Sequence, residues 1–177
     1  TIIDAQGQGR VFYIFGNPTV EGFTMQNGST NGSGGAIHVA LGNPILRYNT
    51  IADSYALLRG GGIYNGGGDL TLEWNTLVGN EAGQNGGGFY NVGDAPLVQY
   101  NIFQSNVAQG KGGGIYKNAG EMDVWSNVFY DNVATTQGGG FYNGSDTSLL
   151  FHNTFVSNTA AADGGSGVYV YGGTAVI

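Results

Sequence analysis

Acidic side chains are the groups of this chain that could cleave a polysaccharide. Hydrolysis of a glycosidic bond uses two carboxyl groups, one to protonate the leaving oxygen and one to activate water. Elimination instead uses an acidic calcium site and a basic residue that removes a proton. The chain has 12 acidic and 5 basic residues. The acidic residues are Asp4, Glu21, Asp53, Asp69, Glu73, Glu81, Asp94, Glu121, Asp123, Asp131, Asp146 and Asp163.

A glycine-rich motif that recurs along the chain defines the elements that must position these side chains. It reads GGGIYN at 60–65, GGGFYN at 86–91, GGGIYK at 112–117 and GGGFYN at 138–143. Related blocks begin at Gly34 and Gly165, so successive blocks are 26 residues apart, and 27 at the last step. Repeats of this length are typical of solenoids. The glycines allow positive φ and a close approach of backbones at a tight corner.

Alignment of the chain at this period places like residues in columns. One apolar column is Val11, Ile37, Ile63, Phe89, Ile115, Phe141 and Val168. An aromatic column beside it is Phe12, His38, Tyr64, Tyr90, Tyr116, Tyr142 and Tyr169. Two further apolar columns are Val20, Leu46, Leu72, Val98, Val124, Leu150 and Ile177, and Met25, Ile51, Leu77, Phe103, Phe129 and Phe155. We expect the apolar columns to stack inward and the aromatic column, with His38, to serve mainly as structural stacking.

The spacing within each repeat predicts β-strands. LTLEW at 70–74 alternates apolar and polar residues, and NTL at 75–77 resumes the alternation after a break. No window shows the 3.6-residue period of a helix. About three short strands are expected per repeat, stacked on those of the next repeat as parallel strands about 4.8 Å apart. The prediction is an all-β, right-handed parallel solenoid of about six to seven coils, formed by residues 1–177 as a single domain.

An asparagine recurs at the break between the last two strands of each repeat. These residues are Asn49, Asn75, Asn101, Asn127 and Asn153. A lone buried carboxamide is costly, but stacked carboxamides can donate to one another, so that only the end members lack a partner. Phe23 replaces asparagine in the first coil. A second polar column follows, made of Ser54, Asn80, Asn106, Asn132 and Asn158.

The motifs resemble those of right-handed parallel β-helix repeat proteins, in particular the repeats of chlamydial polymorphic outer-membrane proteins and related bacterial surface proteins. Those repeats contain GGAI and FxxN. Here GGAI occurs at 34–37, with FQSN at 103–106, FYDN at 129–132 and FVSN at 155–158. The resemblance covers nearly the whole chain and implies a pectin-lyase-like solenoid at the cell surface. It implies no single activity, because this architecture supports lyases, hydrolases, adhesins and structural rods.

At the period of the repeat the acidic residues scatter over many columns. Asp94 and Asp146 share a column two coils apart, and Asp53 and Asp131 share one three coils apart. None of the basic residues converges on an acidic group. We therefore expect no catalytic residues, no metal site, no cofactor and no enzymatic activity.

An exposed aromatic stripe is the candidate binding site. If the break before each asparagine turns two successive residues outward, the stripe comprises Tyr48, Trp74, Tyr100, Trp125, Phe151 and His152. Such rings could stack on sugars or bury against a protein partner, or they could simply stack on one another across coils. A nearby outward threonine column is interrupted by Ile102 and Val128, which disfavours an ice-binding surface.

Composition limits the partners further. The net charge is −7 and charged residues make up 10% of the chain, which disfavours nucleic acid and anionic membranes as partners. There is no cysteine, and no apolar run approaches the ~20 residues of a membrane span. No polar segment suited to cap the open ends of a solenoid is apparent. We expect either a piece of a longer chain with flanking domains, or copies that dock end to end.

The sequence thus predicts a non-catalytic extracellular or cell-surface β-solenoid, structural or adhesive, with end-to-end self-assembly into filaments as a further expectation. The alternative is a polysaccharide-binding or polysaccharide-cleaving β-helix of the lyase or hydrolase type.

Overall fold

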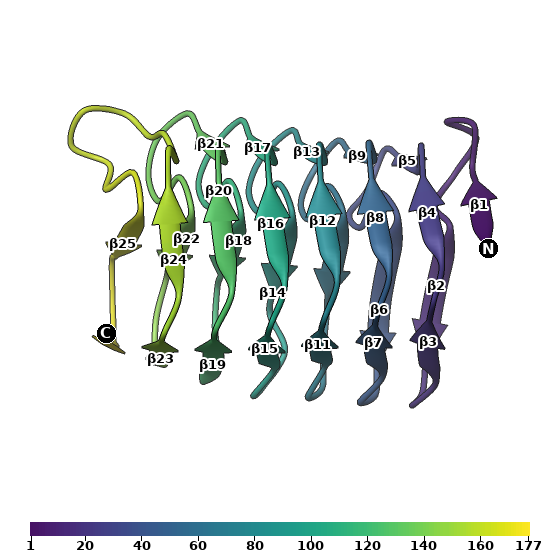
Figure 1. Cartoon of the computed structure of the whole chain (residues 1–177), viewed down its shortest axis with the longest axis horizontal. Helices are drawn as coiled ribbons and strands as arrows, with labels where there is room; N and C mark the ends of the chain where they lie inside the picture. The colour runs from purple at the N-terminus through teal and green to yellow at the C-terminus, as the bar shows by residue number, and fades with distance from the viewer.

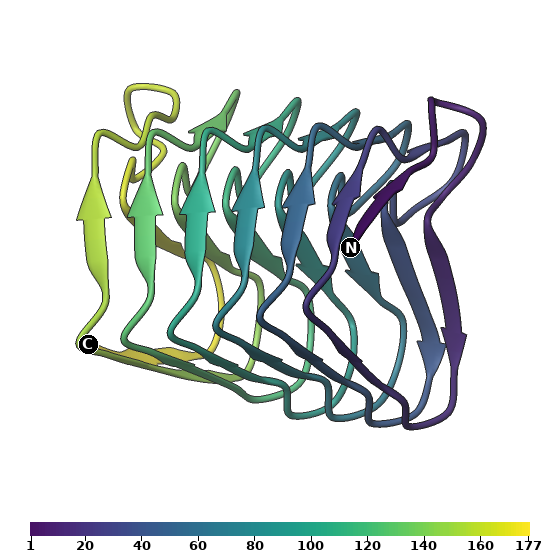
Figure 2. The same ribbon diagram turned by 45° about the vertical axis from the view of Figure 1, so that its right-hand side comes forward.

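The computed structural model describes residues 1–177, and it winds them into a parallel β-solenoid (Figures 1 and 2). All 26 elements are strands and none is a helix. The coils stack along the long axis, so the N-terminus and the C-terminus lie at opposite ends of the stack (Figure 1). The predicted fold class, a parallel solenoid of about seven coils, is confirmed.

Four parallel sheets run along the solenoid. Sheet A contains β1 (Ile2–Asp4), β4 (Thr24–Gln26), β8 (Thr50–Ala52), β12 (Thr76–Val78), β16 (Ile102–Gln104), β20 (Val128–Tyr130) and β24 (Thr154–Val156). Sheet B contains β2 (Phe12–Phe15), β6 (Ile37–Leu41), β10 (Ile63–Asn65), β14 (Phe89–Asn91), β18 (Ile115–Lys117), β22 (Phe141–Asn143) and β25 (Val168–Val170). Sheet C contains β3 (Thr19–Glu21), β7 (Ile45–Arg47), β11 (Thr71–Glu73), β15 (Leu97–Gln99), β19 (Met122–Trp125), β23 (Thr147–Phe151) and β26 (Thr174–Val176). Sheet D contains β5 (Ser29–Thr30), β9 (Tyr55–Ala56), β13 (Glu81–Ala82), β17 (Val107–Ala108) and β21 (Val133–Ala134).

Sheet D is a difference from the sequence expectation, because a full coil has four strands and not three. Each strand of sheet D is two residues long, as in Glu81–Ala82, which pairs with Tyr55–Ala56 on one side and Val107–Ala108 on the other. Two residues are too few to display an alternating pattern. Only the stacking of neighbouring coils gives such a segment its backbone partners.

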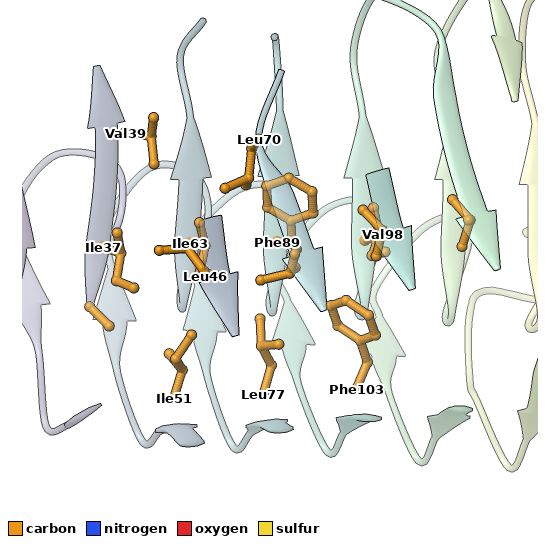
Figure 3. Packing of buried hydrophobic residues seen from close by; sticks show 14 of the residues in the cluster. Ile37, Val39, Leu46, Ile51, Ile63, Leu70, Leu77, Phe89, Val98 and Phe103 are labelled. Carbon is orange, nitrogen blue, oxygen red and sulfur yellow. The ribbon is translucent and has the colours of Figure 1, made fainter. Parts of the chain in front are cut away.

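The register places residues of successive coils directly over one another. Ile63 pairs with Phe89 in sheet B, Leu72 with Val98 in sheet C, and Leu77 with Phe103 in sheet A. The inward side chains of these three sheets form one core cluster, in which Ile63, Leu46 and Leu77 are fully buried (Figure 3). Each such side chain stabilises the fold by roughly 1.5–3 kcal/mol.

The first coil departs from the predicted columns. Phe12 pairs with Ile37 and Tyr13 with His38, so the assignment of Val11 and Phe12 to these two columns was wrong by one residue. The register also shifts between Ile14 and Phe15, as at a β-bulge. The first step is therefore 25 residues long, which a fixed period of 26 cannot detect.

The glycine triplets form the corner between sheets D and B. Gly86 has a φ of +70°, a left-handed conformation that favours glycine. A Cβ atom on Gly87 would lie 2.5 Å from the carbonyl oxygen of Gly113 and 2.6 Å from that of Val107. The repeat therefore keeps glycine here because backbones of adjacent coils meet where any side chain would be.

Candidate functional site: an aromatic corner between sheets C and A

The corner between sheets C and A is built on the asparagine ladder. Asn75 Oδ1 accepts the side-chain Nδ2–H of Asn49 at 3.1 Å and its backbone N–H at 3.0 Å. The Nδ2 of Asn49 also donates to the carbonyl of Val20 at 2.8 Å. The same contacts recur from coil to coil through Asn101, Asn127 and Asn153. Each carboxamide thus holds the backbone of the corner in one conformation.

The two ends of this ladder differ, and only the first departs from the expectation that end members lack a partner. Asn49 Oδ1 accepts the backbone N–H of Phe23 at 3.0 Å. At the other end, Asn153 Nδ2 donates to the carbonyl of Val124 at 2.7 Å. The main chain of Phe23 therefore replaces the missing carboxamide beside Asn49, whereas the contact between Asn153 and Val124 is one that every member of the ladder makes and replaces nothing.

Residues that immediately precede the ladder adopt left-handed backbone conformations. Tyr48, Trp74 and Tyr100 have φ values of 54°, 55° and 56°, and Ser126 and His152 continue the series at 52° and 55°. This geometry turns the side chains outward: Tyr48 is 60% exposed, Trp74 50% and Tyr100 42%. A positive φ is a genuine outlier for a bulky residue.

The second polar column forms a matching corner between sheets A and D. Asn80 Nδ2 donates to Asn106 Oδ1 at 3.0 Å, and the ladder continues through Asn132 to Asn158. The residues that precede its members are also left-handed: Asp53, Gly79, Ser105, Asp131 and Ser157. All of these are glycine or small polar residues. The backbone of such a corner therefore makes no demand for an aromatic side chain.

The corner aromatics stack on one another along the solenoid. The ring centroids of Trp74 and Tyr100 are 4.5 Å apart with planes inclined by 17°, and those of Tyr48 and Trp74 are 6.4 Å apart at 18°. Trp125 lies one position earlier in the repeat, because Ser126 occupies the corner in that coil. Trp125 meets Phe151 edge to face at 5.9 Å. The faces of these rings that point along the solenoid therefore contact the neighbouring ring. The ring edges, and the outer faces of the rings at the ends of the stripe, remain exposed to solvent.

The two histidines have different surroundings. His152 takes the corner position of the last coil and is exposed. His38 lies in the aromatic column of sheet B, between Tyr13 at 5.0 Å and Tyr64 at 4.8 Å. Burial lowers the pKa of His38, against the opposing effect of its hydrogen bond with the Ser33 carbonyl.

Polar side chains of sheet C flank the aromatic corner. The expectation that no basic residue converges on an acidic group was wrong for Arg47, whose guanidinium Nε donates to Glu21 Oε2 at 2.6 Å, because the two lie one period apart on paired strands. Gln99 Nε2 donates to Glu73 Oε2 at 2.9 Å. Arg47 also lies 6.0 Å from the ring centroid of Tyr48. Aromatic edges beside these planar polar groups can contact apolar and hydroxyl groups of one ligand together.

Carboxylates elsewhere serve the turns. Asp69 Oδ1 accepts the backbone N–H of Ala95 at 3.0 Å, and Asp146 Oδ2 accepts that of Gly120 at 3.1 Å. Hydrogen bonds from Asn27 and Gln26 lower the pKa of Asp4. No group of three or more His, Cys, Asp or Glu side chains lies close enough together to hold a metal ion.

Sequence reasoning missed a third polar column, inside sheet B. Its members are Asn65, Asn91, Lys117 and Asn143, all fully buried. Asn65 Nδ2 donates to Asn91 Oδ1 at 2.8 Å. The signal was present in the repeat itself, where GGGFYN alternates with GGGIYK and lysine takes the place of asparagine.

These features define an all-β solenoid with asparagine ladders, exposed corner aromatics and no clustered metal-binding side chains. A family model for the Chlamydia polymorphic membrane protein repeat matches residues 102–117, which run from the FQSN motif in sheet A to the glycine triplet and β18. The resemblance to these repeats is therefore confirmed, over part of one coil. No curated protein and no solved structure matches the chain. The structure has no helix that is long and apolar enough to cross a membrane.

Proposed function

We propose that this solenoid is a non-catalytic adhesive module of the cell surface. Its contact surface is the aromatic corner, which we define as Tyr48, Trp74, Tyr100, Trp125 and Phe151. The repeat family supports the location, and the rigid stack of coils supports a structural role. The dispersal of the carboxylates over separate turns supports a role without catalysis.

The observation that supports this proposal most is the identity of the left-handed corner residues. A left-handed conformation costs an L-residue roughly 1–2 kcal/mol. Stacking of an aromatic pair returns about 0.5–1.5 kcal/mol, so stacking does little more than offset the strain. The corresponding corner between sheets A and D does without aromatics altogether. A binding role accounts for exposed rings at positions where serine or glycine would fold as well.

The proposal can be tested by measuring how variants of the aromatic corner bind to panels of immobilised extracellular proteins and neutral glycans. Trp74→Ser and Tyr100→Ser keep a residue type that the left-handed corner already accepts at Ser126. We expect them to weaken binding at least tenfold with little change in melting temperature. The matched control is Asp131→Ser at the other corner. Binding that survives both corner substitutions would refute the adhesive surface.

Polysaccharide binding is a second candidate for the same corner. It is favoured by the planar polar groups of Arg47, Glu73 and Gln99 beside the rings. In that case the glycan panel gives the binding signal and the protein panel gives none. Release of reducing ends or of unsaturated sugars during incubation would reject the non-catalytic proposal and favour a polysaccharide-cleaving enzyme.

End-to-end association into filaments is a separate structural proposal. The outermost strands β1, β2 and β3 at one end, and β24, β25 and β26 at the other, are each paired on one side only. Unpaired strand edges can add a further coil. Electron microscopy of the 177-residue chain at high concentration tests the idea. Rods many coils long would support it, and a uniform monomer mass would exclude it.

A further inference from the structure

Three of the five basic residues of this acidic chain lie over the outer side of sheet B. Arg10, Arg59 and Lys111 lie over tyrosine rings of sheet B, with distances to the ring centroids of 5.7 Å for Arg10 on Tyr13 and 5.3 Å for Arg59 on Tyr90. Lys111 lies 4.8 Å from the centroid of Tyr142. The one ion pair of the structure, between Arg47 and Glu21, is on sheet C. Arg59 and Lys111 therefore have no carboxylate partner.

Arg59 and Lys111 occupy equivalent positions two coils apart. Each directly precedes a glycine triplet, and Asn85 takes the same position in the coil between them and pairs with Arg59. Two coil steps separate backbones by roughly 10 Å. The stacked sheets hold this spacing rigidly.

Of the stacked tyrosines under these two cations, only Tyr116 is half-buried and can offer its hydroxyl group to a ligand, because Tyr90 and Tyr142 are 2% and 1% exposed. The rings of Tyr90, Tyr116 and Tyr142 stack at centroid distances of 4.8 Å with planes inclined by 5°. The Tyr142 hydroxyl accepts a hydrogen bond from Lys111 Nζ at 3.1 Å, whereas the Tyr116 hydroxyl has no partner within the chain. Burial raises the pKa of Tyr116, so its hydroxyl stays protonated at neutral pH.

The columns of this face contain no acidic residue, although the chain has 12 of them. The column of Arg59 continues as Asn85, Lys111 and Gln137. The outward column that follows the strands of sheet B reads Gly66, Val92, Asn118 and Gly144. The nearest acidic residues are Asp94 and Asp146, two positions beyond the second column, and Asp163, which lies with Gln137 near the C-terminal end, so the positive charge is confined to the surroundings of Arg59 and Lys111.

We propose that this face binds an anionic polysaccharide that runs along the solenoid axis, with its carboxylate or sulfate groups paired to Arg59 and Lys111. We call Arg59, Lys111 and Tyr116 the cation–tyrosine strip; the buried rings of Tyr90 and Tyr142 support the two cations from below. A single small anion cannot reach both cations, whereas a polymer with charges at intervals can. Sugar hydroxyls between the charged groups would meet Tyr116 and Asn85.

Other polyanions fit this strip less well. Affinity for nucleic acid depends on neutralising many closely spaced phosphates, and two cations on an acidic chain cannot do so. Recognition of anionic lipid surfaces typically uses clusters of about four to eight basic residues. The strip lies on a different sheet from the aromatic corner, so the inference holds whether or not that corner binds a partner.

Titration at low ionic strength with dextran sulfate, polygalacturonate and neutral dextran tests the inference. We expect one or both polyanions to bind, neutral dextran not to bind, and affinity to fall as salt is added. A preference between the two identifies sulfate or carboxylate as the recognised group. Arg59→Gln and Lys111→Gln should each weaken binding about fivefold, and the double variant should abolish it.

Control variants distinguish binding at a defined site from attraction that depends only on the net charge of the chain. Gln104→Glu combined with Thr154→Glu lowers the net charge as much as the double variant does, but on sheet A, and should bind like the unaltered chain. Lys111→Arg keeps the cation and should retain binding even if Lys111→Gln proves unstable. Three results would overturn the proposal: equal loss in the charge control, no binding of either polyanion, or tighter binding to single-stranded DNA or phosphatidylserine vesicles.

Discussion

The ammonium group of Lys117 lies 3.0 Å from Oδ1 of Asn143, deep in a core column where the neighbouring coils have asparagine. Its other contact is the carbonyl of Ser145. No carboxylate touches it, and Asp146 and Glu121 attract its charge only from a distance. The repeat thus tolerates one lysine in place of a carboxamide because the long chain reaches carbonyl acceptors near a turn.

The buried Lys117 predicts an unusual dependence of stability on pH. Burial lowers its pKa from 10.5 to about 8 in the folded chain. Between these two values the unfolded chain binds a proton that the folded chain does not, so the free energy of unfolding should rise with pH. Urea denaturation from pH 7 to 9.5 would measure the rise. Burial raises the pKa of Tyr90 to about 12, so loss of stability from tyrosine ionisation begins only above about pH 10.

Lys117→Asn is the matched variant for this effect, since asparagine is the residue of the neighbouring coils. We expect it to be more stable than the unaltered chain at pH 7 and to lose the rise between pH 7 and 9.5. A rise of the same size in the variant would show that another group is responsible.

The middle of the asparagine ladder should be the most sensitive polar position. Asn101→Ala removes donors to the Leu72 carbonyl and to Asn127, and it leaves the amide groups of Asn75 without their acceptor. Each buried group left unpaired costs about 1–3 kcal/mol, so a total loss of about 3 kcal/mol or more is expected in chemical denaturation. Asn153→Ala at the half-buried end of the ladder should cost clearly less. Equal losses would argue against a cooperative ladder.

Glycine triplets should tolerate no side chain where adjacent coils touch. Gly87→Ala would place its Cβ within 2.6 Å of two carbonyl oxygens, so we expect a loss of about 3 kcal/mol or failure to fold. Gly67→Ala is the control, because its Cβ would come no closer than 3.6 Å to any atom. Thermal unfolding followed by circular dichroism separates the two. A Gly87→Ala variant as stable as Gly67→Ala would contradict the close coil contact.

Removal of a corner aromatic should leave the fold intact. Trp74→Ser keeps the left-handed strain, because serine also has a Cβ atom, and gives up ring stacking of about 0.5–1.5 kcal/mol, so the free energy of unfolding should fall by no more than about 1.5 kcal/mol. Tyr116→Ser in the buried column of sheet B should cost several times more. If Trp74→Ser proved as destabilising, the corner rings would be structural, and the case for an adhesive surface would fail.

Most of the fold can be predicted from the period of the repeat. Because each coil lies directly on the next, columns such as Ile63–Phe89 and Leu77–Phe103 are read from the chain at a spacing of 26 residues. The same logic predicts the stacked asparagines and the outward direction of Tyr48, Trp74 and Tyr100. It fails where the repeat is irregular, as at the bulge of the first coil, and where a strand is only two residues long.

Some relationships depend on the path of the chain between columns. The chain alone aligns Arg59 with Lys111, since they are two periods apart, but it does not reveal that the corner at the glycine triplet brings both over the tyrosine rings. Nor does it reveal that the rings of Tyr48, Trp74 and Tyr100 stack face to face, whereas Trp125 and Phe151 meet edge to face. The sequence by itself determined which residues stack, because stacking repeats with the period. Tertiary structure alone decided which columns meet around a coil, because that depends on the angle of each corner and on the left-handed residues that form it.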